Sequence, residues 1–327
     1  MMTGLLIAGA AGCASALMFA SISSGALISL LLFYLAPLPL MVAAIGWSPN
    51  SAAIGGSVAG LCLGAIFGFP YFAAYLLTVA LPAWWLGRIV MLGRPLAPED
   101  SVPAPAAGIP IPTAMEWYPI GRLLLWIAGF AALTTIATML TLGTDGAAIQ
   151  EALRRGLTRL VTGSSDATPS ADAAKVIAAL TVIAPSAAAI IATTTLTLNL
   201  WLAGYVTATS GRLRRPWPTL RATTLPPMTL VALLVALAFC FSGGLAGLIA
   251  QVITAALLLV YAFVGFAVLH TITQTMRTRT LLLATIYAAV TVFGWPIVVL
   301  TALGLVDALI GIRERYLGQQ PPAPPLS

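Results

Sequence analysis

Charged residues are scarce in this chain of 327 residues, since 15 Lys and Arg and 9 Asp and Glu make up only 7% of it. A soluble domain carries about 25% charged residues, and it needs polar side chains to cover its surface in water. The low charge therefore excludes a cytosolic enzyme, a disordered chain and a typical nucleic-acid-binding domain. Because 60% of the residues are hydrophobic, the composition predicts an all-α, polytopic membrane protein.

Residues and motifs typical of metal, disulfide and nucleotide-binding sites are equally few. The chain has one histidine and three cysteines, Cys13, Cys62 and Cys240, which lie in apolar runs without a CxxC pair. This pattern gives no support to a metal site or a disulfide framework, and no phosphate-binding loop of the GxxxxGK[ST] type is present. We therefore expect no enzymatic activity, no metal and no cofactor. The net charge of +6 is explained by basic loops at the ends of membrane spans, so no nucleic-acid partner is expected.

Long uncharged intervals predict about nine membrane spans. A helix needs about 20 apolar residues to cross a hydrocarbon core of about 30 Å. With turns placed at serine, glycine and proline clusters, the spans fall near residues 4–21, 26–46, 51–68, 69–90, 120–142, 183–209, 225–241, 246–272 and from 280 onward. The sixth span is expected to carry Pro185 in its first turn, where proline is tolerated.

The spans and the segments between them define the expected organisation of the chain. The predicted regions are a four-span bundle at 1–92, a proline-rich loop at 93–119, a fifth span at 120–142, an extramembrane loop at 143–174, C-terminal spans at 175–316 and a disordered tail at 317–327. Seven prolines between 95 and 119 favour an extended linker without a packed core.

The loop at 143–174 contains an amphipathic helical pattern. Asp145 is a candidate N-cap, and it precedes an apolar stripe made of Ile149, Leu153, Leu157, Leu160 and Val161. Arginines occupy the opposite side, and Glu151 can pair with Arg155 one turn later. The pattern predicts a helix lying on the membrane surface. Packing of this helix against other loops is the alternative.

The distribution of basic residues predicts the orientation. With nine spans and a cytoplasmic N-terminus, 9 of the Lys and Arg residues fall inside and 6 outside, as the positive-inside rule requires. If the last segment instead folds back at Gly294-Trp295-Pro296, the ratio becomes 11 to 4. Each arm of such a hairpin would span only about 21–24 Å. The segment 280–312 is therefore either one kinked span or a re-entrant hairpin.

Two spans carry small residues at every fourth position. The third span has Gly56, Gly60, Gly64 and Gly68, and the first has Ala8, Gly12, Ala16 and Ala20. Such a face lets another helix approach closely in a membrane. The partner is either another span of this chain, which we favour for the third span, or a separate membrane subunit. For the first span, both kinds of partner remain open.

Polar side chains inside the apolar segments are candidates for ligand binding. Asn199 follows a threonine cluster in the sixth span, Gln251 lies in the eighth, and Asp307 lies near the end of the last. Threonines often bond back to their own helix, whereas an amide or a carboxylate in lipid faces a partner or a cavity. Asn199, Gln251 and Asp307 are therefore the candidate ligand-binding residues. Pairing with the nearby arginines is the alternative for Asp307.

Three segments resemble the YybS-like family of bacterial membrane proteins. They are Tyr34-Leu35-Ala36-Pro37-Leu38-Pro39-Leu40, the glycine-rich third span, and the ending Phe293-Gly294-Trp295-Pro296 … Leu303-Gly304-Leu305-Val306-Asp307. That family is remotely similar to the substrate-binding S-components of energy-coupling-factor transporters, which dock a coupling subunit through small residues of their first helix.

The resemblance implies a small-molecule binding or transport subunit in the bacterial cytoplasmic membrane. Its expected partners are the lipid bilayer, other membrane subunits and a small ligand of unknown identity. The alternative function is a structural or assembly protein of the cell envelope that has no small ligand.

Overall fold

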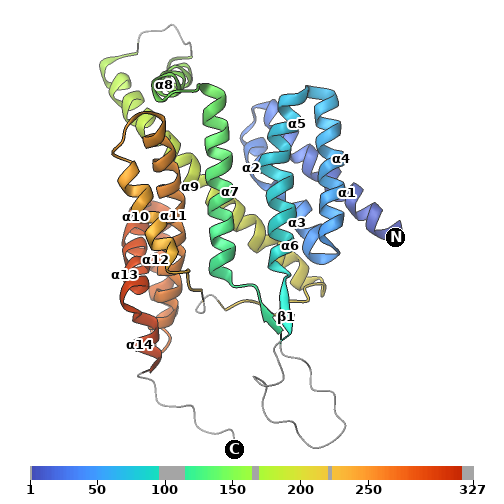
Figure 1. Cartoon of the computed structure of the whole chain (residues 1–327), viewed down its shortest axis with the longest axis vertical. Helices are drawn as coiled ribbons and strands as arrows, with labels where there is room; N and C mark the ends of the chain where they lie inside the picture. Colours follow the sequence, from blue (N-terminus) through green and yellow to red (C-terminus); the bar gives the residue numbers. More distant parts are fainter. Residues whose placement is uncertain (1, 96–114, 164–168, 220–222, 319–327) are drawn as a thin grey trace, which may run out of the picture. The chain divides into compact units, whose positions relative to one another are not determined.

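The structure is a computed structural model that describes residues 2–95, 115–163, 169–219 and 223–318. It divides into two compact units, which are considered separately. Unit 1 comprises Met1–Ile127 and Thr195–Pro218, and unit 2 comprises Ala128–Thr194 and Thr219–Ser327. Helices α7 (Ile120–Leu142) and α9 (Ala171–Thr209) contribute residues to both units. The described residues are almost entirely helical, as the composition predicts (Figure 1).

Unit 1 is built mainly from the first 90 residues. Its elements are α1 (Met2–Ala20), a 3₁₀ turn η1 (Ser21–Ser24), α2 (Leu27–Leu35), α3 (Pro37–Gly46), α4 (Pro49–Phe67), α5 (Phe69–Tyr75), a π-helical turn η2 (Leu76–Ala80) and α6 (Leu81–Val90). Local chemistry sets these boundaries. Ser48 caps α4 by accepting a bond from the Ser51 amide at 3.3 Å, and Pro49 occupies the first position, where no N–H is needed.

Small residues bring α1 and α4 into close contact. An ideal Cβ built on Gly12 would collide with the carbonyl group of Gly55, and one on Gly55 would collide with that of Ala8. The two backbones therefore touch, which is the arrangement that small residues permit in membranes. Ala8 and Gly12 are buried, and Ala16 and Ala20 are half-buried. This face of the first span packs within the chain.

The glycine face of the third span is also filled from within unit 1. A Cβ on Gly56 would lie 3.0 Å from the Ala80 methyl group, and one on Gly64 would lie 2.9 Å from Phe72. Gly60 faces the ring of Phe72 as well. Gly68 ends α4 with a φ of 92°. The packing alternative, favoured for this span from the sequence, is the arrangement found.

Unit 2 holds the remaining helices. They are α8 (Gly146–Thr162), α10 (Met228–Phe239), α11 (Gly244–Ile272), α12 (Arg279–Phe293), α13 (Pro296–Ile310) and α14 (Ile312–Gly318), together with the parts of α7 and α9 within its bounds. The most buried helix is α11, and α13 packs against it along much of its length. A Cβ on Gly265 would collide with Leu300, and one on Gly304 would collide with Tyr261.

Helices α12 and α13 form a hairpin beside α11. Gly265 lies near Gly304, and beyond the C-terminal ends of both helices the hydroxyls of Thr275 and of Tyr316, on α14, are 3.0 Å apart. These two contacts show that α11 and α13 run in the same direction, so α12 must reverse the chain between them (Figure 1). Gly294, with a φ of 71°, makes the turn, and Pro296 begins α13. The fold-back at Gly294-Trp295-Pro296 is therefore observed, and one kinked span over 280–312 is not.

The expected count of about nine spans is not confirmed. Seven helical segments among the described residues are long and apolar enough to cross a membrane. The segments expected as the seventh and ninth spans are the shorter helices α10, α12 and α13. Helix α10 has 12 residues, or about 18 Å at 1.5 Å per residue. Pro226 and Pro227 precede it, and Ser242-Gly243-Gly244 follows it.

The sixth span differs from its prediction at its N-terminal end. Helix α9 begins at Ala171, not near 183, and Pro185 lies in its interior, not in its first turn. Ser170 caps the helix by accepting a bond from the Ala173 amide at 3.3 Å. An interior proline is tolerated in membrane helices because neighbouring groups satisfy the freed carbonyl. With 39 residues, α9 is about 58 Å long, so its first turns extend beyond the apolar layer.

Two short strands depart from the all-α prediction. β1 (Gly93–Pro95) pairs antiparallel with β2 (Met115–Trp117), so the ends of the proline-rich loop are held together. The centre of that loop, residues 96–114, lies outside the described residues. The predicted disordered tail, apart from residues 317 and 318 in α14, lies outside them too.

Candidate functional site: a proline break in the second span

The second span is interrupted between α2 and α3. Pro37 and Pro39 carry no backbone N–H, so the carbonyl groups one turn earlier, at Phe33 and Leu35, lose their usual helical donors. The Ala36 amide bonds to Phe33 instead, at 3.2 Å. Residues Leu27–Gly46 form one candidate span, so this break lies well inside the apolar layer. Side chains from other helices bond to the backbone there.

Asn199 on α9 contacts the break. Its Nδ2 donates to the carbonyl oxygen of Tyr34 and to that of Thr195, both at 2.8 Å. The residue is 0% exposed. Both amide hydrogens are therefore used, whereas the Oδ1 atom has no hydrogen-bond donor among the described residues. A buried acceptor without a donor costs about 1–3 kcal/mol, so this oxygen is the unsatisfied polar atom of the site.

A second polar chain reaches the same break from α1. The Ser15 hydroxyl donates to the Ala36 carbonyl at 2.7 Å, and the Tyr75 hydroxyl donates to Ser15 at 2.8 Å. Both side chains are fully buried. The rings of Phe19 and Tyr75 pack edge to face with centroids 5.3 Å apart. The proline break is therefore held by hydrogen bonds from α1 and from α9.

Asp307 on α13 is engaged in an ion pair. Its Oδ2 accepts bonds from Arg313 Nε at 2.9 Å and Nη2 at 2.7 Å, and its Oδ1 accepts one from the Arg313 amide at 3.0 Å. Arg313 Nη1 also donates to the Thr223 carbonyl at 2.8 Å. The two side chains are 5% and 9% exposed. Gly311, with a φ of 63°, makes the turn that brings Arg313 back. Pairing with an arginine, the alternative for Asp307, is thus what the structure shows.

The three candidate ligand-binding residues are divided between the two units, and each is described within its own unit. Asn199 belongs to unit 1, whereas Gln251 and Asp307 belong to unit 2. Gln251 is half-buried on α11, and the described residues show no polar contact to it. Of the three, Asn199 alone combines full burial with an unsatisfied oxygen.

Arg215 forms buried hydrogen bonds to the backbone that the sequence did not predict. Its guanidinium is buried, with 7% of the residue exposed, and it donates to the carbonyl groups of Val90 and Tyr118 at 2.9 Å each. Burial lowers the pKa of Arg215 below its usual value. The C-terminal carbonyls of a helix such as α6 are unsatisfied and partly negative. Arg215 therefore ties the end of α6 to the segment before α7.

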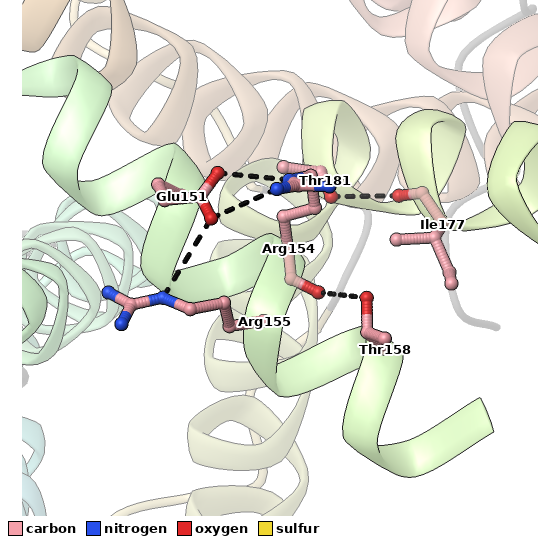
Figure 2. A network of polar contacts seen from close by, with 6 residues as sticks. All are labelled: Glu151, Arg154, Arg155, Thr158, Ile177 and Thr181. Atoms are coloured by element: carbon pink, nitrogen blue, oxygen red, sulfur yellow. Dashed lines mark hydrogen bonds and ion pairs between the residues drawn. The ribbon is translucent and has the colours of Figure 1, made fainter. Parts of the chain in front are cut away.

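Helix α8 carries the amphipathic pattern that the sequence predicts. Asp145 caps it by accepting a bond from the Ala148 amide at 2.9 Å. Figure 2 shows Glu151 between Arg154 and Arg155, at 2.9 Å and 3.9 Å. The exposed Arg154 guanidinium lowers the pKa of Glu151. The apolar stripe divides, because Ile149 is fully buried and Leu160 is 83% exposed. One end of α8 packs on α11, while the other presents apolar side chains outward.

No protein-family model, curated protein or solved structure matches this chain. The fold and composition define its class: the apolar helices are those of a multi-pass integral membrane protein.

Proposed function

We propose that this protein is a small-molecule binding subunit of the bacterial cytoplasmic membrane, and that its ligand binds at the proline break of the second span. The ligand supplies an N–H or O–H group to Asn199 Oδ1. The protein works with partner chains that move or use the ligand. In the proposed orientation, the segments 93–119 and 210–223 and the end of α13 face the cytoplasm, and α8 faces outward.

The observation that carries this proposal is the unsatisfied Oδ1 of Asn199 in a fully buried residue. A polar atom in the apolar layer is costly unless it is bonded, and a ligand donor recovers that cost only when it binds. Interrupted helices are also the usual place for ligand sites in membrane transporters, because their backbone groups are free to bond. The resemblance to the YybS-like family, described from the sequence, favours the same role.

The test compares small molecules that remain bound after purification in a mild detergent. Wild type and the Asn199→Leu variant are denatured, and the released molecules are identified by mass spectrometry. Thr194→Leu is the matched control, since Thr194 is an exposed neighbour on α9 whose hydroxyl donates to the Ile190 carbonyl of its own helix. We expect one molecule with a donor group to accompany wild type and the control, and to be absent from Asn199→Leu.

A second variant separates ligand binding from support of the break. Ser15→Ala removes the bond to Ala36 but leaves Asn199 intact, so it should lower stability and retain the ligand. An Asn199→Leu protein that stays folded and keeps the same molecule would refute the site. A folded wild type without any small molecule would favour the alternative role in envelope structure or assembly.

A further inference from the structure

A groove of about 420 Å³ lies in unit 1 at the end of α6 and the start of α7. Its walls include both strands of the β1–β2 hairpin and the first turn of α7. The side chains that matter for its chemistry are those of Arg94, Glu116, Trp117, Tyr118 and Arg122. We refer to it as the hairpin groove.

The hairpin groove is electropositive. Arg94 is neutralised by its ion pair with Glu116 at 2.5 Å. Arg122 is exposed, and no acidic partner contacts it among the described residues. Arg215 does not line the groove but adds a second positive charge next to two residues that do, because its guanidinium lies 6.0 Å from the centre of the Trp117 ring and bonds to the Tyr118 carbonyl. Within the described part of the chain, an anion in the groove would therefore meet two positive charges, those of Arg122 and Arg215, that have no acidic partner.

The position of the groove along the spans sets its depth. The groove lies where one candidate span, Phe69–Val90, ends and another, Ile120–Leu142, begins. Figure 1 shows β1 beyond the ends of α6 and α7. Tryptophan and tyrosine gather at the boundary between lipid and water, and here Trp126 Nε1 donates to the Tyr118 hydroxyl at 3.1 Å. The groove therefore lies at the level of lipid headgroups.

We propose that the hairpin groove binds the headgroup phosphate of an anionic phospholipid. Arg122 donates to the phosphate oxygens, since a guanidinium matches phosphate with paired hydrogen bonds. Trp117 and Tyr118 border the glycerol region. Basic pockets at the ends of membrane helices are suited to such headgroups, and a lipid reaches this depth without leaving the bilayer. The site is separate from Asn199 and does not depend on the ligand proposed there.

The test places the full-length protein in lipid nanodiscs that contain phosphatidylcholine with or without phosphatidylglycerol. Native mass spectrometry then counts the lipids retained by wild type and by Arg122→Gln. Arg159→Gln is the control, because Arg159 is an exposed arginine outside the groove. We expect phosphatidylglycerol to be retained in preference to phosphatidylcholine. Arg122→Gln should weaken that preference about fivefold, the factor that roughly 1 kcal/mol per basic side chain gives, and Arg159→Gln should not.

Three outcomes overturn the proposal. Equal retention of the two lipids by wild type removes the headgroup preference. An equal loss in Arg122→Gln and Arg159→Gln shows that only the overall charge matters. Displacement of phosphatidylglycerol by added inorganic phosphate shows that the groove takes a free phosphate and not a lipid. Elution of each variant at the wild-type volume in gel filtration confirms that the comparison uses folded protein.

Discussion

The Asp307–Arg313 pair is predicted to be the most sensitive polar contact in unit 2. Asp307→Ala leaves the Arg313 guanidinium buried without its carboxylate partner, although Nη1 still donates to the Thr223 carbonyl. Removing one partner of a buried ion pair costs about 3–5 kcal/mol, whereas replacing both by apolar residues is often neutral. Asp307→Ala should therefore lower the free energy of unfolding by about 3–5 kcal/mol, and the double variant Asp307→Ala/Arg313→Met should recover much of that loss.

The assay is reversible unfolding in mixed detergent micelles, followed by circular dichroism, for wild type, both single variants and the double variant. Glu151→Ala is the control, because the Glu151–Arg154 pair is exposed, at 46% and 59% of the side chains. Exposed pairs contribute little to stability, so this variant should unfold like wild type. The reasoning fails if Asp307→Ala is as stable as Glu151→Ala, or if the double variant is no more stable than Asp307→Ala.

Three further predictions test other parts of the structure. Gly12→Leu should destabilise the protein by about 1–3 kcal/mol or more, because Gly12 touches the Gly55 backbone. Gly9→Leu should be tolerated, because a Cβ there meets no atom within 4 Å. Thermal melting in detergent compares the stability of the two variants. Arg215→Met should lower the free energy of unfolding by about 1.5–3 kcal/mol, since two carbonyls lose a charged donor. Arg214→Met, at an exposed position, should have the same melting temperature as wild type. Cysteines placed at 278 and 315 should react with a membrane-impermeant reagent from the same side of the membrane, and a cysteine at 162 from the other; opposite sides for 278 and 315 would rule out the α12–α13 hairpin.

Local chemistry made some features predictable from the sequence. Asp145 before an apolar stripe predicted the capped helix α8, and the Gly294-Trp295-Pro296 sequence indicated a kink or a reversal, of which the structure shows the reversal. In both cases the signal and its effect lie within a few residues of each other. The start of α9 was predicted too late, because the uncharged interval 176–211 is longer than one straight span needs and Pro185 suits a first turn. Ser170, a residue type common at N-caps, marks the true start.

Contacts between distant segments were not predictable in this way. The bond from Asn199 to Tyr34 joins residues 165 positions apart, and the bond from Tyr75 to Ser15 joins residues 60 apart. In a membrane helix the lipid-facing and buried sides are both apolar, so the hydrophobic pattern does not say which faces meet. Arg215 was missed for a related reason: it lies among four arginines of one loop, and only the structure shows which of them is buried.

The side-chain carbonyl of Asn199 provides the most direct test of the proposed ligand site. The chain has two asparagines, Asn50 and Asn199, and Asn50 is exposed, so an Asn50→Ser protein grown with isotope-labelled asparagine reports on Asn199 alone. A hydrogen bond lowers the stretching frequency of a carbonyl. The account predicts a lower frequency in gently purified protein than in the same protein after exhaustive washing has removed its small molecules. An unchanged frequency, with mass spectrometry confirming that small molecules were removed, would contradict it.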